Sequence, residues 1–182
     1  MEKTMKKLAT FSSVVAIVLW IVNCLVTASI LSIMMITFLT TAYHFDMRLL
    51  VGTILGKKYQ NIDPNNSWFQ EKRFEKKLYN LLGVRSWKKH IPTYSPNSFD
   101  LNKTELPEIL RNTCTSEIVH EAIVICSFIP VLISLTIPFL RDDVVIFLIT
   151  SILAACVDSI FIIVQRYNRP RLRKIIARKK PN

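Results

Sequence analysis

The sequence predicts an all-α integral membrane protein with about four membrane-embedded helices, two N-terminal and two C-terminal, and an interfacial helical segment between them. Three observations predict this fold. Hydrophobic residues make up 51% of the 182 residues although the formal net charge is +11, and the apolar residues are gathered into blocks almost free of charge. The blocks are also long enough to span a membrane, since about 20 apolar residues, each with a rise of about 1.5 Å, cross the hydrocarbon core of a bilayer. The third observation is the basic tail that follows the last block. The length predicts one membrane domain over residues 1–182.

The two C-terminal blocks, Ile118–Leu140 and Val144–Gln165, each have the length of one crossing. Each carries a single formal charge. Only the short polar stretch Arg141–Asp142–Asp143 separates them, so we expect a membrane hairpin over residues 117–165.

The N-terminal membrane block, residues 8–43, contains no charged residue. It is longer than the ~7–15-residue apolar core of a signal peptide, so we expect it to be retained. Its length leaves two interpretations open. One is a pair of short crossings with a turn near Asn23–Ser29, and the other is one long tilted helix.

Basic residues indicate the orientation. The tail, residues 166–182, contains Lys and Arg but no acid, and Lys3, Lys6 and Lys7 precede the first block. Because positive residues near membrane ends stay in the cytoplasm, both termini are expected there. The segment between the blocks, residues 48–116, also has an excess of Lys and Arg and is expected on the same side.

A helix is predicted within this segment. Asp63–Asn66 is a turn sequence, Ser67 and Gln70 have the spacing of a capping box, and Gly83 is a stop signal. One predicted face is aromatic and apolar, and the other is charged and mainly basic: Glu71, Lys72, Arg73, Glu75, Lys76 and Lys77. Such a helix suits the lipid headgroup region. The alternative is a helix docked on protein with its charges solvated.

A short helix is expected over Glu105–Arg111, after a polar run, with the third membrane segment capped separately by Thr115 or Ser116. The four cysteines lack the paired spacing of a disulfide framework or a zinc site, so no metal is expected. With three glycines, the chain has no glycine-rich phosphate loop.

Glu117 and His120 could carry chemistry. Their i, i+3 spacing places them on one helix face. A carboxylate beside an imidazole can act as a general-base pair, in which Glu117 orients the ring and His120 takes a proton from a hydroxyl. The alternative is a polar helix end lying among headgroups.

Asp158 lies inside the last apolar block, where a carboxylate is costly and requires a partner. Arg166 or His120 could supply it from a similar depth. The alternative is a protonated Asp158 that has only a packing role.

Polar residues are interspersed with the first arginines of the tail. Arginine forks bind carboxylate or phosphate in a defined geometry, and Arg166 and Arg169 are the candidates. Gln165 and Asn168 could add hydrogen bonds to a headgroup or sugar. The distal tail is typical of a patch that sets topology and binds anionic lipid.

Three stretches in this order resemble the glycosyl-4,4′-diaponeurosporenoate acyltransferase family. They are Val84-Arg85-x-Trp87-Lys88, Glu117-x-x-His120 with the later Pro130, and the ten residues from Ile163 to Leu172. Members are membrane enzymes that add a fatty acyl chain to a glycosylated carotenoid in the staphyloxanthin pathway. The chain has Asp158 and Ile160 where the family pattern has Asn and Pro, which identifies it as a divergent member and leaves a different acceptor open.

The resemblance implies O-acyl transfer to a hydroxyl of a lipid or glycolipid, at the cytoplasmic face of a bacterial cell membrane. His120 is the expected base and Glu117 its orienting partner. The expected substrate-binding residues are Trp87, Lys88, Asp158, Gln165, Arg166, Tyr167, Asn168 and Arg169. No cofactor is expected beyond an acyl donor such as a phosphate-bearing acyl thioester, and the expected partners are membrane lipids, not nucleic acid.

Two rival functions and the oligomeric state stay open at this point. One rival is a non-catalytic lipid-binding membrane subunit. The other is a membrane lipid hydrolase or lyase that uses the same Glu–His pair to activate water.

Overall fold

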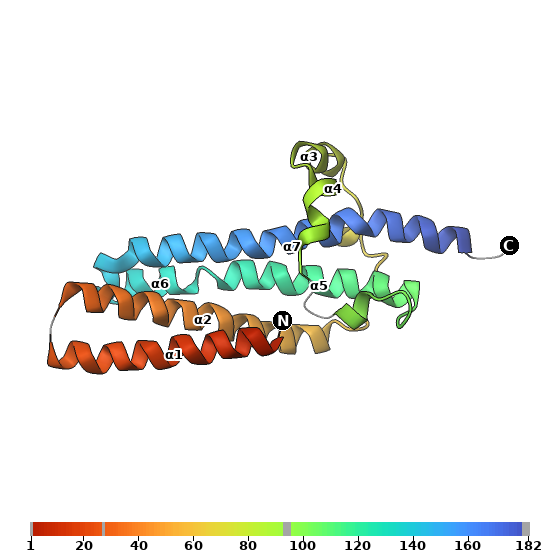
Figure 1. Cartoon of the computed structure of the whole chain (residues 1–182). Helices are drawn as coiled ribbons and strands as arrows, with labels where there is room; N and C mark the ends of the chain where they lie inside the picture. The colour runs from red at the N-terminus through yellow and green to blue at the C-terminus, as the bar shows by residue number, and fades with distance from the viewer. Residues whose placement is uncertain (1, 27, 93–95, 180–182) are drawn as a thin grey trace. The chain divides into compact units, whose positions relative to one another are not determined.

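The computed structural model describes residues 2–26, 28–92 and 96–179 (Figure 1). The last three residues of the basic tail and the first two of the polar run over residues 94–102 therefore lie outside the described residues. Four helical stretches are long and apolar enough to cross a membrane. Two are N-terminal and two C-terminal, and short helices lie between the pairs, as predicted. The chain forms two compact units. Unit 1 contains residues 1–53 and 122–158, and unit 2 contains residues 54–121 and 159–182.

Unit 1 begins with the helices α1 (Glu2–Leu25) and α2 (Ser29–Lys58), which run antiparallel (Figure 1). The break between them falls within the predicted turn, so the first block is two helices and not one long tilted helix. The Ser32 hydroxyl and the Asn23 side-chain oxygen are 3.4 Å apart across this break.

Small side chains dominate the buried positions of unit 1, and large apolar side chains are exposed. The buried set includes Ala9, Ser12, Ala16, Thr40, Ala42, Ser127, Ser134, Ser151, Ala154 and Ala155. Close packing of helices through small residues is typical of membrane proteins, because lipid can cover large apolar side chains on the outside.

The third apolar stretch is interrupted. Helix α5 (Leu106–Cys126) ends before α6 (Ile129–Thr136), which is followed by the 3₁₀ turn η4 (Pro138–Asp143). Pro130 has no N–H to donate to the carbonyl of Cys126, four residues earlier. The Tyr43 hydroxyl donates to that carbonyl instead, at 2.8 Å, which satisfies a backbone group that lipid could not.

Unit 2 corrects the prediction of a separate short helix over residues 105–111. Helix α5 continues from Leu106 past Thr113, Thr115 and Glu117 without a break. The hydroxyls of both threonines donate to carbonyls, Thr113 to Leu110 and Thr115 to Tyr59. A threonine that bonds to carbonyls in this way remains inside a helix and caps nothing.

The predicted helix from Ser67 to Leu82 is two pieces, the 3₁₀ turn η1 (Ser67–Phe69) and α3 (Glu75–Leu81). The carbonyls of Trp68, Phe69 and Gln70 accept hydrogen bonds from Arg166 and Arg169. These bonds to two arginines hold the three carbonyls in a direction that competes with a continuous helix. The cap also differs, because the Asn66 side chain and not Ser67 accepts from the Trp68 N–H at 2.9 Å. The stop at Gly83 is confirmed by its left-handed φ of 58°.

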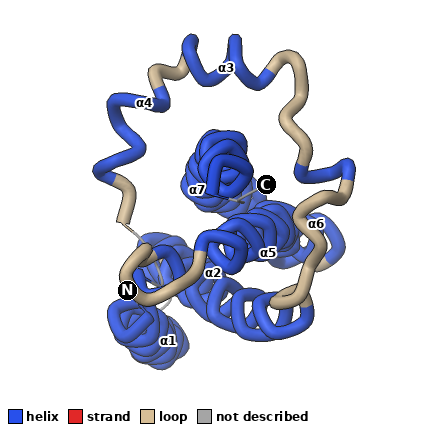
Figure 2. Tube along the Cα trace, turned by 90° about the vertical axis from the view of Figure 1, so that its right-hand side faces the viewer, coloured by secondary structure: helices blue, strands red, loops and turns tan. Residues whose placement is uncertain are grey.

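After Gly83 come α4 (Val84–Trp87) and the 3₁₀ turns η2 (Lys88–His90) and η3 (Pro96–Phe99). The final helix, α7, spans Val144–Lys179, and its second half belongs to unit 2. Figure 2 shows the segment with α3 and α4 arching round α7, which is seen end-on. The candidate site lies within unit 2, where this arch, α5 and α7 contact one another.

Candidate active site

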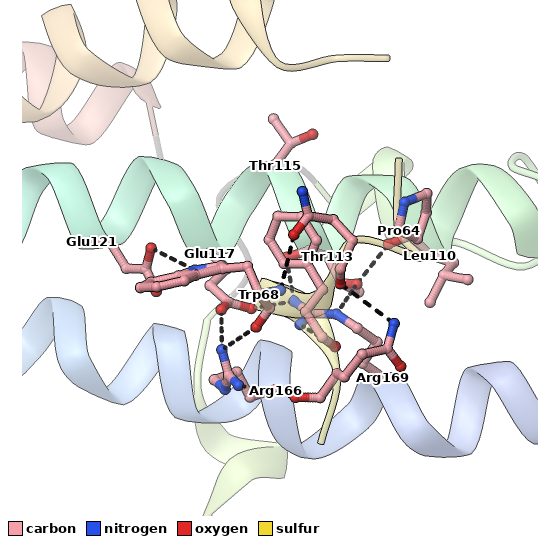
Figure 3. A network of polar contacts seen from close by, with 12 residues as sticks. Pro64, Trp68, Leu110, Thr113, Thr115, Glu117, Glu121, Arg166 and Arg169 are labelled. Atoms are coloured by element: carbon pink, nitrogen blue, oxygen red, sulfur yellow. Dashed lines mark hydrogen bonds and ion pairs between the residues drawn. The ribbon is translucent and has the colours of Figure 1, made fainter. Parts of the chain in front are cut away.

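The centre of unit 2 is the carboxylate of Glu117 on α5, whose side chain is completely buried. One oxygen pairs with the guanidinium of Arg166 and the other with that of Arg169, both on α7 (Figure 3). Charge-assisted pairs of this kind are stronger than neutral hydrogen bonds. Two ion pairs thus join Glu117 of α5 to the stretch from Ile163 to Leu172, which we call the tail motif.

Arg166 also forms an ion pair with a second carboxylate, that of Glu75. Its Oε1 accepts from Nε and Nη2 of Arg166 at 2.9 and 2.6 Å, and its Oε2 accepts from the Tyr79 hydroxyl at 2.9 Å. Burial, followed by the hydrogen bond to Glu75, raises the pKa of Tyr79 above its usual range, so the phenol keeps its proton. Glu75 is only 3% exposed, which corrects its predicted place among the lysines and arginines of the outward charged face.

Arg169 is the most deeply buried cation of the site, at 2% exposure. Besides Glu117, its guanidinium donates to the carbonyl of Phe69 and to the hydroxyl and carbonyl of Thr113, at 3.2–3.3 Å. It also lies 5.1 Å from the centre of the Phe69 ring. Two arginines and two glutamates balance in charge, which lowers the cost of burying all four.

The Trp87–Lys88 stretch contacts the tail motif directly. The Lys88 ammonium donates to Asn168 Oδ1 at 2.5 Å and lies 4.5 Å from the centre of the Tyr167 ring. Burial, with the nearby Arg171 and Arg85, lowers the pKa of Lys88. The Trp87 indole N–H donates to the Leu82 carbonyl at 2.9 Å, which ties the end of α4 to the end of α3.

His120 lies one turn after Glu117 on α5 and is half-buried. Its ring stacks on that of Phe161 of α7, with centres 4.8 Å apart and planes 8° apart. Glu121 lies beside it, and the Trp68 indole N–H points to the Glu121 carboxylate at 3.2–3.3 Å. The predicted orienting role of Glu117 toward the His120 ring stays a prediction. The described partners of the two Glu117 oxygens are Arg166 and Arg169.

Asp158 belongs to unit 1, where its described partner is Arg48. The Arg48 guanidinium of α2 donates to Asp158 Oδ2 at 2.9 Å and 2.5 Å, and also to the carbonyls of His44 and Ala154. Arg48 was expected at the start of the polar segment, but α2 continues to Lys58 and brings it into the helical bundle of unit 1. Gln165 is half-buried on α7, next to Arg166.

Two cavities open beside Arg166. The first has a volume of about 260 Å³ and is lined by charged and polar side chains, among them Gln70, Glu75, Arg166, Arg173 and Lys174. The second has a volume of about 360 Å³ and is mainly apolar, with Trp68, Phe74, Leu78, Tyr79 and Ile163 in its lining. Glu75 and Arg166 line both, so one ion pair stands between a polar and an apolar cavity.

Sequence reasoning missed Glu75, Tyr79, Thr113 and Arg48 as partners of the buried charges. A usable signal existed for the first two, because Glu75 and Tyr79 are an i, i+4 pair within a run of lysines and arginines. Nothing in the sequence marks Thr113 or Arg48, which are selected only by the packing of distant helices.

Comparison with known proteins identifies the family. No curated protein and no solved structure matches the chain. The family model of glycosyl-4,4′-diaponeurosporenoate acyltransferase matches residues 65–178, well over half of the chain. That range contains every residue of the ion-pair cluster in unit 2. The chain belongs to the glycosyl-4,4′-diaponeurosporenoate acyltransferase family, and it is an acyltransferase of carotenoid biosynthesis.

Proposed function

We propose that the protein transfers a fatty acyl chain from an activated donor to a hydroxyl of a glycolipid, with a carotenoid glycoside as the first acceptor to test. One observation carries the proposal. Apart from Pro130, which lies in unit 1, the three stretches that resemble the family motifs meet in unit 2, where Lys88 bonds to Asn168 and Glu117 pairs with Arg166 and Arg169. Segments far apart in the sequence that converge on buried charges are typical of an active site.

The reaction requires one proton acceptor near the acceptor hydroxyl. With an acyl thioester as donor, the hydroxyl oxygen attacks the carbonyl carbon, a C–O bond forms and the C–S bond breaks. The hydroxyl proton moves to a base and then to the departing thiolate. We assign the base to His120, whose ring is held by the stack on Phe161.

The other residues have positioning and binding roles in this proposal. Glu117 holds Arg166 and Arg169 in place, and so acts on the substrates through the arginines. Trp87, Lys88, Gln165, Tyr167 and Asn168 line the acceptor's approach along α7. Asp158, in unit 1, fixes Arg48 and therefore acts on the packing of the helices.

The test is the variant His120→Ala, compared with His90→Ala in the same membrane preparation. His90 is exposed on η2 and serves as the matched control. We expect the rate of acyl transfer by H120A to fall by about 10²–10⁴-fold, the usual contribution of a general base. H90A should keep the parent rate, and both variants should keep the parent's thermal unfolding.

Three outcomes would contradict the proposal. Parent-like transfer by H120A would move the base to Glu75, the carboxylate that lines both cavities. Free fatty acid in place of an acylated acceptor would identify a hydrolase. Lipid that copurifies stoichiometrically, with no turnover of any acyl donor, would identify a lipid-binding subunit.

A further inference from the structure

The two cavities of unit 2 differ in chemistry but share a wall. Glu75 and Arg166 belong to the linings of both. An activated fatty acyl donor is likewise built from an apolar chain and a polar carrier, joined at the reacting carbonyl. We infer that the apolar cavity holds the acyl chain of the donor and the polar cavity holds its phosphate-bearing carrier, an inference that rests on the proposed acyl transfer.

The apolar cavity fits the part of an acyl chain next to the carbonyl. Its volume of about 360 Å³ lies within the ~300–1,000 Å³ range of ligand sites. Leu78 and Tyr79 of α3 and Ile163 of α7 belong to its lining, together with Trp68 and Phe74, which are 56% and 63% exposed. Large aromatic side chains left this exposed can guide a lipid chain into the cavity.

The lining of the polar cavity carries more positive charge than its ion pairs neutralise. Arg166 and Arg169 are matched by Glu75 and Glu117, whereas Arg173 and Lys174 add two further cations to the lining. Glu71 is the remaining acid there, and it pairs with Lys76 at 3.7 Å.

Arg173 is already oriented in this cavity. It donates through Nη1 to Gln70 Oε1 at 2.6 Å and through Nη2 to the Pro64 carbonyl. Its Nε is buried and has no hydrogen-bond partner among the described residues. An oriented guanidinium in the lining of the cavity, next to an exposed Lys174, suits a phosphate.

The shared wall then lies where the two parts of the donor join. The carbonyl of the thioester is placed against Arg166, whose guanidinium is fixed by Glu75 on one side and Glu117 on the other. In this arrangement the carbonyl oxygen replaces one of the two long bonds of Arg166, those to the carbonyls of Trp68 and Gln70 at 3.3 Å, and the oriented cation then stabilises the negative charge that develops during attack.

Chain-length preference tests the apolar cavity. The variant Leu78→Trp fills the cavity, and Leu81→Trp, at an 84% exposed position of the same helix that lines neither cavity, is the matched control. With coenzyme A thioesters of increasing chain length, L78W should shift the kcat/KM ratio toward short chains by about tenfold or more, as expected for a pocket that excludes methylenes. L81W should keep the parent's ratio.

An unchanged ratio in L78W would overturn the inference. Should L78W not fold, Leu78→Ala replaces it, and the ratio must then shift toward long chains. Crosslinking of a photoreactive long-chain acyl thioester to the parent protein provides a readout that needs no turnover. Crosslinks within residues 68–79 or at Ile163 and Arg166 support the inference, and crosslinks confined to other segments overturn it. If these crosslinks form but no acyl transfer is detected, the proposed function is wrong and the binding site for the acyl chain is still supported.

The polar cavity is tested by Lys174→Ala, with Lys179→Ala on the same helix as the control. K174A should raise the KM for a coenzyme A thioester several-fold and leave the KM for an N-acetylcysteamine thioester, which lacks phosphate, unchanged. An equal change for both donors, or no change for either, would overturn the assignment of the carrier to this cavity.

Discussion

Arg169 and Arg171 are separated only by Pro170, yet their surroundings are opposite. Arg169 is 2% exposed and its guanidinium is enclosed by Glu117, Thr113 and Phe69. Arg171 is exposed. Removing one partner of a buried ion pair leaves the other charge buried without compensation, which is far more costly than losing a surface charge.

We therefore predict that Arg169→Ala lowers the free energy of unfolding by about 3 kcal/mol, the lower end for a broken buried pair, because Glu117 remains buried with Arg166 as its one remaining cation. Arg171→Ala should change it by less than about 0.5 kcal/mol. Thermal unfolding of both variants in the same detergent checks this. Arg169→Lys should not restore stability, since an ammonium cannot reproduce the fork of bonds to Glu117, Thr113 and Phe69. Equal stability of R169A and R171A would show that the buried pair contributes little.

The sequence predicts several residues of the candidate site, but it does not predict which of them contact one another. Glu117 and Arg166 were identified because polar groups beside apolar blocks are costly. Their direct contact depends on how α5 packs on α7, and nothing in the spacing of the two residues encodes that. Arg48 is the clearest omission. It was assigned to the polar segment by composition, and only the length of α2 places it beside Asp158.

At the scale of elements, the long apolar helices were predictable and the segment between them only partly so. Hydropathy locates α1 and α2 because lipid requires long apolar runs. The break between η1 and α3 was not predictable, since the competing donors for its carbonyls come from Arg166 and Arg169 in a distant helix. Local signals that need no tertiary partner, such as the stop at Gly83, were correct.

The arch over α7 exposes apolar side chains next to cations. Trp68, Phe74, Leu81 and Leu82 are between 43% and 84% exposed, while Lys72, Lys76 and Lys77 are exposed nearby in the sequence. This combination is typical of a segment in the headgroup region, where apolar groups enter the acyl boundary and lysines meet anionic lipid.

Fluorescence quenching tests the interfacial placement. A protein with Trp68 as its only tryptophan, made by Trp20→Phe and Trp87→Phe, should be quenched by lipids brominated near the headgroup. A matched protein that keeps only Trp20, within α1, is the reference for a membrane helix. Quenching of Trp68 by aqueous iodide, with none by brominated lipid, would instead place the arch in water and remove the route by which a lipid chain enters the apolar cavity.

For the whole molecule, orientation is the property with the largest functional consequence. Four crossings, three N-terminal lysines and an acid-free basic tail predict that both termini lie in the cytoplasm. The segment between α2 and α5 is then cytoplasmic as well, since two crossings precede it. A soluble thioester donor made inside the cell could reach the cavities only with this orientation.

We predict the labelling pattern of single cysteines placed in a background that lacks the four natural ones. Asn61→Cys, in the exposed stretch after α2, should react with a membrane-impermeant maleimide only after the cells are permeabilised. Asp142→Cys, exposed in η4, should react in intact cells. The opposite pattern would place the cavities on the outer face and exclude an intracellular donor. Labelling of both positions from outside would instead show that α5 and α6, the apolar helices between these positions, do not complete a crossing, and the count of four would be wrong.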